Sequence, residues 1–311
     1  MSLVINTTTP EGIVIAADSR QSYRNRKGIS RIGSDSAKKL YKINKRVGVA
    51  ITGLAFIEIN GILKNVSSVI DEFIESNDVE SMSVENVVNN LYQSFSESYN
   101  VEQQFQRIEN KVQQDLQKQG CSEIKFTRNK NLLQFSFIDP NGSVKNANAN
   151  IEQINFLVAG FNEDKSHEVY VCYLPGDIQK KRNSKEKGRE YGASWLGQTD
   201  LVSRIILGFD PRIGNLPSIK KLGNNIGKEL RNLEYSIQWG TMTLQDGVDF
   251  SDLMIKTTTA LQRFSDGIAA EPGDMPGVGG DVDIAVITKN GGFVWINKKS
   301  IIYNDTKMDI E

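Results

Sequence analysis

The pattern of apolar and polar residues predicts strands at the start of the chain. Residues 3–5 and 7–9 form a β-prone run, and Pro10 to Gly12 has the composition of a turn. The continuous apolar run 13–17 is typical of a buried strand. A polar stretch, 21–36, is predicted to be a loop. A second strand pair is then expected at 39–43 and 47–51.

Apolar residues at helical spacing follow these strands. They run from Ile59 to Phe73 and from Val84 to Phe95, and the second stripe continues from Ile108 to Leu116. Such a stripe covers a sheet more often than it binds a partner. Ser83 is a plausible N-cap. Three further helices are predicted, at 195–207, 219–233 and 243–264, the last with a capping box of Thr243 and Asp246.

Strands return between and after these helices. They are expected at 132–138, 154–158, 169–174, 282–287 and 293–296. The last two are joined by the turn Lys289 to Gly292, which is a clear hairpin signal. Blocks of strands that alternate with helices predict an α+β fold in which two sheets are covered by helix layers. We expect residues 1–311 to form one domain, with insertions near 100–150 and 209–240.

Composition narrows the class of protein. The chain has 311 residues, of which 39% are hydrophobic, and a net charge of -1. This charge gives no general attraction to nucleic acid or to anionic lipid. The start lacks the basic region of a secretory signal, and no segment approaches the ~20 apolar residues of a membrane span. A cytoplasmic protein is therefore expected, with Cys121 and Cys172 as reduced structural thiols.

The single histidine, His167, limits the chemistry. A metal site built from several histidines is impossible, and two cysteines make a four-ligand Cys/His site improbable. His167 stands in a polar run, 163–167, and is interpreted as an exposed turn residue rather than a catalytic one. A hydrolase of this sequence would therefore use a base other than imidazole.

Two other segments have simple interpretations. The basic run Lys180 to Arg189 is expected to be a solvated loop, because no nucleic-acid motif or interleaved aromatic residues accompany it. The glycines in 273–280 precede a strand instead of opening a helix, so a turn is expected there and not a phosphate loop. No cofactor and no metal are expected.

The first residues carry a family resemblance. Residues 2–20, with Ser2 at the start, a hairpin, and Asp18-Ser-Arg20 after an apolar strand, resemble the first hairpin of proteasome β-subunits. Asp18 lies 16 residues after Ser2, as in that family. Four more segments resemble the family in the right order, namely 37–41, 49–55, 242–249 and 279–288.

This resemblance implies the four-layer α/β/β/α sandwich of N-terminal nucleophile hydrolases and a peptidase mechanism. Ser2 would be the nucleophile after removal of Met1, and its own α-amine, with an ordinary pKa of about 7.7–8.0, would be the base. Lys39 would lower that pKa by like-charge repulsion, and Asp18 would hold Lys39 in an ion pair. The backbone N–H of Gly53 would face the oxyanion. The resemblance further implies a homo-oligomeric ring or spiral that acts on peptides or unfolded proteins.

The sequence departs from the family in the nucleophile, which is Ser instead of Thr, and in the lack of a pro-peptide. Thr7, Thr8 and Thr9 are an alternative, but they lie too close to Asp18 for the family hairpin. The family's supporting polar residues cannot be placed. Candidates are the segments 192–194 and 197–199 for one of them, and Ser265 or Asp266 for the other. Two other functions remain open, a non-proteolytic amidase or transpeptidase and a catalytically inactive scaffold in which Asp18 and Lys39 form a structural salt bridge.

Overall fold

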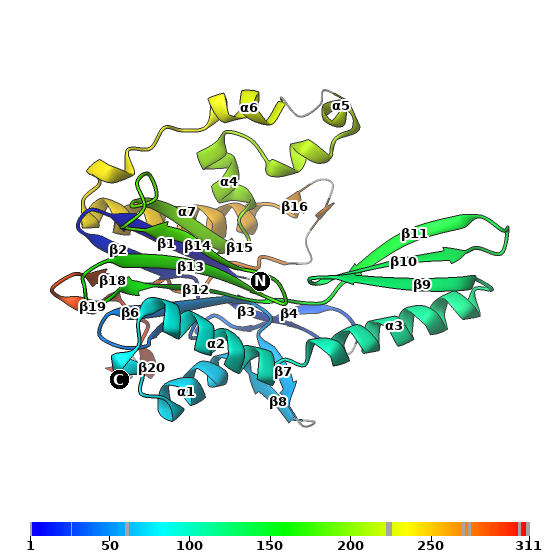
Figure 1. The fold of residues 1–311 in the computed structure, drawn as a ribbon, viewed down its shortest axis with the longest axis horizontal. Helices are drawn as coiled ribbons and strands as arrows, with labels where there is room; N and C mark the ends of the chain where they lie inside the picture. Colours follow the sequence, from blue (N-terminus) through cyan, green and yellow to red (C-terminus); the bar gives the residue numbers. More distant parts are fainter. Residues whose placement is uncertain are drawn as a thin grey trace.

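Two five-stranded antiparallel sheets form the body of the protein, which is described by a computed structural model (Figure 1). The structure describes residues 2–25, 27–59, 62–221, 226–268, 271–272, 275–303 and 306–308. In spatial order, the first sheet contains β15 (Gly192–Gly197), β1 (Leu3–Thr9), β2 (Gly12–Ala17), β18 (Asp283–Thr288) and β19 (Gly292–Asn297). The second contains β14 (Ile178–Asn183), β13 (His167–Leu174), β12 (Ile154–Phe161), β6 (Val47–Gly53) and β5 (Leu40–Lys42).

The β1–β2 hairpin lies in the interior of the first sheet. Every residue of both strands is buried, because β1 is flanked by β15 and β2 by β18. The hairpin turns at Pro10 and Glu11, and Thr9 pairs with Gly12. A Cβ on Gly12 would lie 2.8 Å from the carbonyl oxygen of Ile287 in β18, so the close approach of that strand favours glycine here. The predicted opening strands and turn are confirmed.

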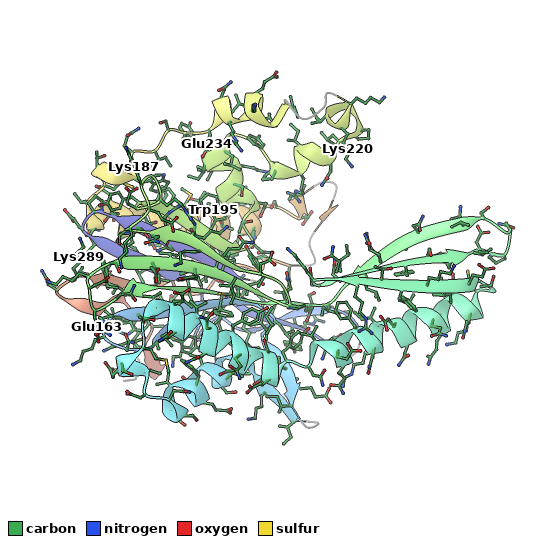
Figure 2. The ribbon with its side chains drawn as sticks, viewed as in Figure 1. Glu163, Lys187, Trp195, Lys220, Glu234 and Lys289 are labelled. Atoms are coloured by element: carbon green, nitrogen blue, oxygen red, sulfur yellow. The ribbon has the colours of Figure 1, made fainter. Side chains whose placement is uncertain are left out.

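Three apolar clusters hold the layers together. The first lies between the two sheets and joins residues such as Val4 and Ile15 to Ala50 and Leu157. The second packs the outer face of the second sheet against α1 (Val66–Ser76) and α2 (Val84–Ser98). The third packs the outer face of the first sheet against α4 (Asp200–Leu207) and α7 (Leu244–Phe264). Trp195 of β15 packs against this third cluster, beneath α4 (Figure 2). The described residues thus form a mixed α/β fold with several sheets and seven α-helices.

The helix caps predicted from the sequence at Ser83 and at Thr243 and Asp246 are present in the structure. Ser83 caps α2 by accepting a hydrogen bond from Asn86 N, and Thr243 and Asp246 form the capping box of α7. The helix predicted from Ile59 is wrong in its first part. Residues there form a hairpin of β7 (Phe56–Ile59) and β8 (Ile62–Asn65), and α1 begins only after Asn65, whose side chain accepts a bond from Ser67 N. Ile62 and Leu63 met the helical spacing, but both are exposed on this hairpin.

A projecting arm fills the predicted insertion near 100–150 (Figure 1). It consists of α3 (Val101–Lys118), β9 (Ser122–Asn129), β10 (Leu132–Ile138) and β11 (Val144–Asn150), and the three strands form one antiparallel sheet. Its own core contains Phe105, Leu133 and Ile151. The predicted stripe from Val84 to Leu116 is divided between α2 and α3, because the helix ends at Tyr99 and Asn100 caps the next one.

The second predicted insertion, 209–240, carries short helices. They are η2 (Pro211–Asn215), α5 (Pro217–Lys220), α6 (Ile226–Leu230), η3 (Arg231–Leu233) and η4 (Trp239–Thr241). This segment contacts α4, where Tyr235 N donates to Ile206 O at 2.9 Å. Lys220 and Glu234 mark it in Figure 2. The helices expected at 195–207 and 219–233 are only partly present, since Trp195 lies in β15 and residues 222–225 lie outside the described part of the chain.

Three more predictions are corrected. The loop expected at 21–36 contains a hairpin of β3 (Gln21–Arg24) and β4 (Ser30–Ser34). The basic run begins in strand β14, where Lys180 pairs with Glu168 of β13 at 2.8 Å. His167 is only 4% exposed, because the chain after β14 folds over it and Glu190 O lies 2.7 Å from its Nε2. The remaining described strands are β16 (Gly267–Ile268), β17 (Glu271–Pro272), β20 (Ile301–Tyr303) and β21 (Thr306–Met308).

Cys121 and Cys172 are both free thiols, as expected. Among the described residues, none of the helices combines the length and the apolar content that a bilayer span requires.

Candidate functional site

Ser2 lies at the end of the first sheet, directly before β1. It is 6% exposed, and its carbonyl oxygen accepts a hydrogen bond from Gln198 N at 2.7 Å. Gly197, the last residue of β15, has a φ of 93°, and a Cβ there would lie 2.0 Å from the Ser2 carbonyl oxygen. The end of β15 therefore fixes the backbone of Ser2 and requires glycine to do so. Met1 lies outside the described residues.

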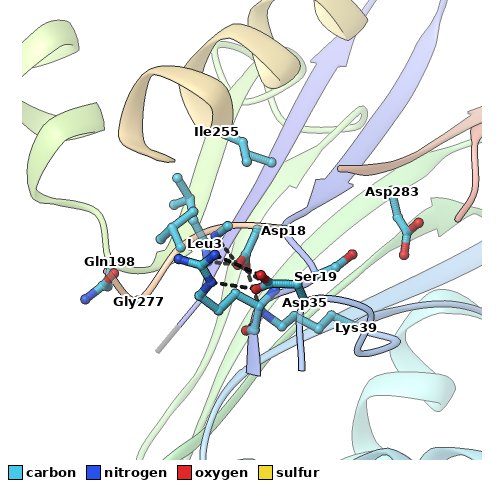
Figure 3. Close-up of polar contacts among 12 residues, drawn as sticks. Leu3, Asp18, Ser19, Asp35, Lys39, Gln198, Ile255, Gly277 and Asp283 are labelled. Atoms are coloured by element: carbon cyan, nitrogen blue, oxygen red, sulfur yellow. Dashed lines mark hydrogen bonds and ion pairs between the residues drawn. The ribbon is translucent and has the colours of Figure 1, made fainter. Parts of the chain in front are cut away.

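Asp18 follows β2 and lies beside the start of β1, because Val4 pairs with Ala17. Its carboxylate is completely buried and accepts four hydrogen bonds. Oδ1 accepts from Leu3 N at 2.9 Å and from Lys39 Nζ at 2.8 Å, and Oδ2 accepts from Arg20 N at 3.1 Å and from Gly279 N at 3.0 Å (Figure 3). Three backbone donors and one cation satisfy this buried carboxylate.

Lys39, the residue directly before β5, extends its side chain to Asp18. It is 5% exposed, and its ammonium donates to both Asp18 Oδ1 and the carbonyl oxygen of Arg20. Desolvation by burial lowers the pKa of Lys39, while the charge and hydrogen bond of Asp18 oppose this shift. The ion pair that the sequence predicts between Asp18 and Lys39 is therefore present, and it is buried.

Two further ion pairs surround the first. Arg20 binds Asp35 in a bidentate pair, with Nε–Oδ1 2.6 Å and Nη2–Oδ2 3.0 Å. Lys299, from the segment after β19, donates to Ser19 Oγ at 2.9 Å and to the carboxylate of Asp283. Each of the three consecutive residues 18–20 therefore contacts an ion pair. Asp18 and Arg20 each bind a side chain of opposite charge, and Ser19 accepts a hydrogen bond from Lys299. The positive charges of Lys299 and Arg20 also contribute to lowering the pKa of Lys39.

Gly53, the last residue of β6, completes the group. Its φ is 90°, and a Cβ there would lie 2.1 Å from the carbonyl oxygen of Gln153, so this position requires glycine. Ser2, Lys39, Thr52 and Gly53 line one small cavity of about 30 Å³. Ala37 and Lys38, which directly precede Lys39 in the chain, also contribute to the wall of this cavity. The structure therefore brings Ser2, Lys39 and Gly53 to a common space, with Asp18 behind Lys39.

A larger cavity of about 880 Å³ lies beyond Gly197, between α4 and the end of α7. Gln198 and Gln262 line it, and Gln262 Nε2 donates to Gln198 Oε1 at 2.7 Å. Gln262 Oε1 accepts from Gly277 N and Val278 N, both at 2.9 Å, which fixes the orientation of the amide. This glutamine pair was not predicted from the sequence, because nothing local in either segment indicates the contact.

The candidates for the supporting polar residues lie in different places in the structure. Ser194 is buried within β15, opposite Asn6 of β1, and lines neither cavity. Thr199, Ser265 and Asp266 line the larger cavity. Thr7 Oγ1 hydrogen-bonds Ser251 Oγ of α7 at 2.9 Å, so it lies on the face of β1 that packs against that helix.

The arrangement joins a hydroxyl-bearing residue at the start of the chain, a buried cation and a glycine at a strand end. A cation near an amine lowers its pKa, and a backbone N–H at a strand end can stabilise an oxyanion. Among the described residues, no group of three or more His, Cys, Asp or Glu side chains is arranged to hold a metal ion.

Comparisons with known proteins give likenesses in structure and none in sequence. No family model matches the chain, and no curated protein matches it. Among solved structures, the chain is similar to Anbu (ancestral beta-subunit) from Yersinia bercovieri, with a TM-score of 0.48 and 10% sequence identity. That likeness covers 95% of this chain and 88% of the Anbu chain.

Proposed function

We propose that this protein is an amide hydrolase whose nucleophile is the hydroxyl of Ser2, with a peptide bond as its substrate. The observation that carries the proposal is that Ser2, Lys39 and Gly53, far apart in the sequence, line one cavity, while the buried Asp18 holds the Lys39 ammonium at 2.8 Å. The packing of helices on the outer faces of two sheets fits the four-layer α/β/β/α sandwich of N-terminal nucleophile hydrolases.

In the proposed reaction, removal of Met1 gives Ser2 a free α-amine. This amine takes the proton of the Ser2 hydroxyl while Oγ forms a bond to the substrate carbonyl carbon. The Gly53 N–H stabilises the negative charge on the carbonyl oxygen. The proton then passes to the leaving nitrogen, the C–N bond breaks, and an acyl ester remains on Ser2. Water then attacks that ester while the amine takes a proton from the water. The amine passes this proton to Ser2 Oγ as the C–O bond breaks, which releases the acid and restores the hydroxyl.

The charges around Ser2 suit this role for its amine. Lys39 stays beside Asp18, so its positive charge lowers the pKa of the amine and keeps a larger neutral fraction near pH 7. Arg20 and Lys299 add to the positive field, and Asp35 and Asp283 balance their charges. We further propose one domain over residues 1–311 with two insertions, a cytoplasmic location, and a homo-oligomeric ring or spiral that acts on peptides or unfolded proteins.

The test is covalent labelling with a β-lactone, which esterifies an activated hydroxyl. Intact mass first establishes that Met1 is absent from the purified protein. The parent is expected to gain one acyl group on the peptide that begins at Ser2, and Ser2→Ala is expected to gain none. Ser22→Ala is the matched control, since Ser22 lines the same cavity, and it is expected to react like the parent. Equal labelling of the parent and Ser2→Ala would rule out the proposed nucleophile.

A scaffold role is the second candidate, and one observation favours it. Lys39 donates to two acceptors, Asp18 and the Arg20 carbonyl, an arrangement that also suits a purely structural ion pair. Retention of Met1 in protein isolated from cells, together with no labelling, would support the scaffold. Labelling with turnover of small amides but not of peptides would indicate an amidase or transpeptidase.

A further inference from the structure

The arm formed by α3 and β9–β11 presents one strand edge to solvent. Its sheet has the order β11-β10-β9, and β9 lies next to α3, so β11 is the strand farthest from that helix (Figure 1). Within the described part of the chain, no strand pairs with the outer side of β11. All but one of its residues are exposed. A row of backbone N–H and C=O groups is therefore available to another strand.

The alternation of hydrogen bonds in an antiparallel pair identifies the backbone groups that point outward. At the two ends of the β10–β11 pair, Ile151 N donates to Asn131 O and Asp139 N donates to Ser143 O, both at 2.9 Å. The odd-numbered residues of β11 therefore exchange their backbone hydrogen bonds with β10. The even-numbered residues direct their N–H and C=O groups away from β10, and these are Val144, Asn146, Asn148 and Asn150.

The opposite edge of the same sheet is protected, whereas β11 is not. In β9, Arg128 binds Glu102 and Glu109 of α3 at 2.6 Å each, so the helix is held beside that strand. The pairing of β9 with β10 also contains a register shift. Charges, a covering helix and a β-bulge each keep an edge from pairing with another chain. In contrast, β11 has one charged residue, Lys145, no proline, and a regular register with β10.

The strand is complementary to itself in one antiparallel register. When a two-fold axis at Ala147 relates two copies of β11, all the outward residues of both copies pair, which gives about eight backbone hydrogen bonds. A register centred on any other residue pairs fewer of them. Ala147 then faces Ala147 of the second copy without hydrogen bonds between them, and the two Cα atoms approach to about 4.5 Å, where small side chains fit.

The side chains suit the same register. Asn146 faces Asn148 of the second copy, and amide side chains on opposite strands can hydrogen-bond to each other. Lys145 lies 3.9 Å from Asp139 of its own chain and faces Ala149 of the second copy. The two Lys145 side chains are then four positions apart, about 13 Å at 3.3 Å per residue. Like charges therefore do not meet across the axis.

We infer that β11 is an interface between two copies of this chain, which join their arms edge to edge into one continuous sheet. This contact is isologous, whereas a ring or spiral is built from head-to-tail contacts, so the arm interface is separate from the proposed ring. The inference does not rest on the proposed function of Ser2. It gives the arm, an insertion into the fold, a role in assembly.

Single cysteines test the register. Ala147→Cys and Val144→Cys are compared in the Cys121→Ser background, with oxidised glutathione as the oxidant, and both positions are exposed. Two copies of Ala147→Cys hold their cysteines opposite each other, whereas two copies of Val144→Cys hold them six positions, about 20 Å, apart. We expect disulfide-linked dimers to form at least about tenfold faster from Ala147→Cys, because only that pair meets the Cα separation of a disulfide. Equal rates, or a faster reaction of Val144→Cys, would overturn the inference.

Charge complementation tests the same contact at equilibrium, by sedimentation velocity over a concentration series. Ala147→Glu and Ala147→Lys each place like charges across the axis and are expected to weaken the association of the arms at least about tenfold. An equimolar mixture pairs Glu with Lys and is expected to return to within about threefold of the parent. This recovery requires folded arms, so it separates repulsion from misfolding.

Gln114→Glu is the matched control, because it adds the same charge at an exposed position of α3, away from β11. It is expected to associate like the parent. An association that neither Ala147 variant weakens would contradict the interface. So would a mixture that stays as weak as the single variants, or an equal loss in Gln114→Glu.

Discussion

The buried pair of Asp18 and Lys39 leads to the sharpest stability prediction. Asp18→Asn keeps the shape of the side chain and removes its charge. The Asp18 carboxylate accepts four hydrogen bonds, and an amide has only one acceptor oxygen, so its NH₂ group would face donors such as Arg20 N and Gly279 N. At the same time Lys39, 5% exposed, would lose its counter-ion.

The expected cost follows from this geometry. Removing one partner of a buried ion pair costs about 3–5 kcal/mol, because the other charge stays buried without compensation. The pKa of Lys39 is already lowered by burial, and loss of Asp18 lowers it further. Since the unfolded chain then binds the lysine proton more readily than the folded protein, the deficit is largest at pH below the folded pKa and shrinks as pH rises towards the ordinary value of about 10.4.

The neighbouring lysine provides a control within the same segment. Lys38 pairs with Asp71 at 3.1 Å, but the two side chains are 54% and 48% exposed. Asp71→Asn is therefore expected to cost less than about 1 kcal/mol. Lys39→Met in the Asp18→Asn background removes the stranded cation and is expected to recover part of the loss.

The measurement is equilibrium unfolding in urea at pH 7, followed by tryptophan fluorescence and circular dichroism, for the parent and the three variants. The free energy of unfolding is taken from the midpoint and slope. The reasoning is refuted if Asp18→Asn and Asp71→Asn destabilise the protein equally, or if the added Lys39→Met makes Asp18→Asn still less stable.

Three other predictions follow from single residues. Gly53→Ala places a Cβ 2.1 Å from Gln153 O at a φ of 90°, so we expect a loss of more than about 2 kcal/mol in urea unfolding and no β-lactone adduct on Ser2; a stable, fully reactive variant would contradict this. Burial lowers the pKa of His167 below its ordinary value of about 6.5, so the folded protein binds this proton less readily than the unfolded chain does. The free energy of unfolding therefore falls as pH drops below that value. The urea midpoint of His167→Gln is expected to fall less than that of the parent between about pH 7.5 and 5.5, and equal falls would contradict this. Leu133→Ala empties the core of the arm, where Leu133 is completely buried, and is expected to cost about 2–5 kcal/mol locally; hydrogen exchange should then rise in α3 and β9–β11 and stay unchanged in β1 and β2, whereas a rise throughout the body would show that the arm does not unfold separately.

The parts of the fold that could be predicted are those with strong local signals. The β1–β2 hairpin has a continuous apolar run and a Pro-Glu-Gly turn, and α7 has its capping box. The arm strand β11 could not be predicted, because the sequence VKNANAN alternates only small alanines with asparagines, which have low β-propensity, and all but one of its residues are exposed. His167 was misplaced for a related reason. Its neighbours in the sequence are polar, but packing against Phe161 and Tyr191 buries it.

The candidate site divides in the same way. Asp18, Lys39 and Gly53 could be named because they stand at the ends of predicted strands at the spacing of a known family. The contacts of Gln198 with Gln262 and of Ser19 with Lys299 join segments that are 64 and 280 residues apart. No local pattern in a single sequence indicates such pairs, so only the folded structure reveals them.

The central claim is that the hydroxyl and the amine of one residue, Ser2, act together beside Lys39. An α′,β′-epoxyketone tests this directly, since it can bond to both groups and close a ring that resists hydroxylamine. The measurement is the fragment mass of the N-terminal peptide after reaction and hydroxylamine treatment. The account predicts a stable adduct that joins Ser2 N and Oγ in the parent and none in Lys39→Met. An adduct on another residue, or an equal yield in Lys39→Met, would contradict it.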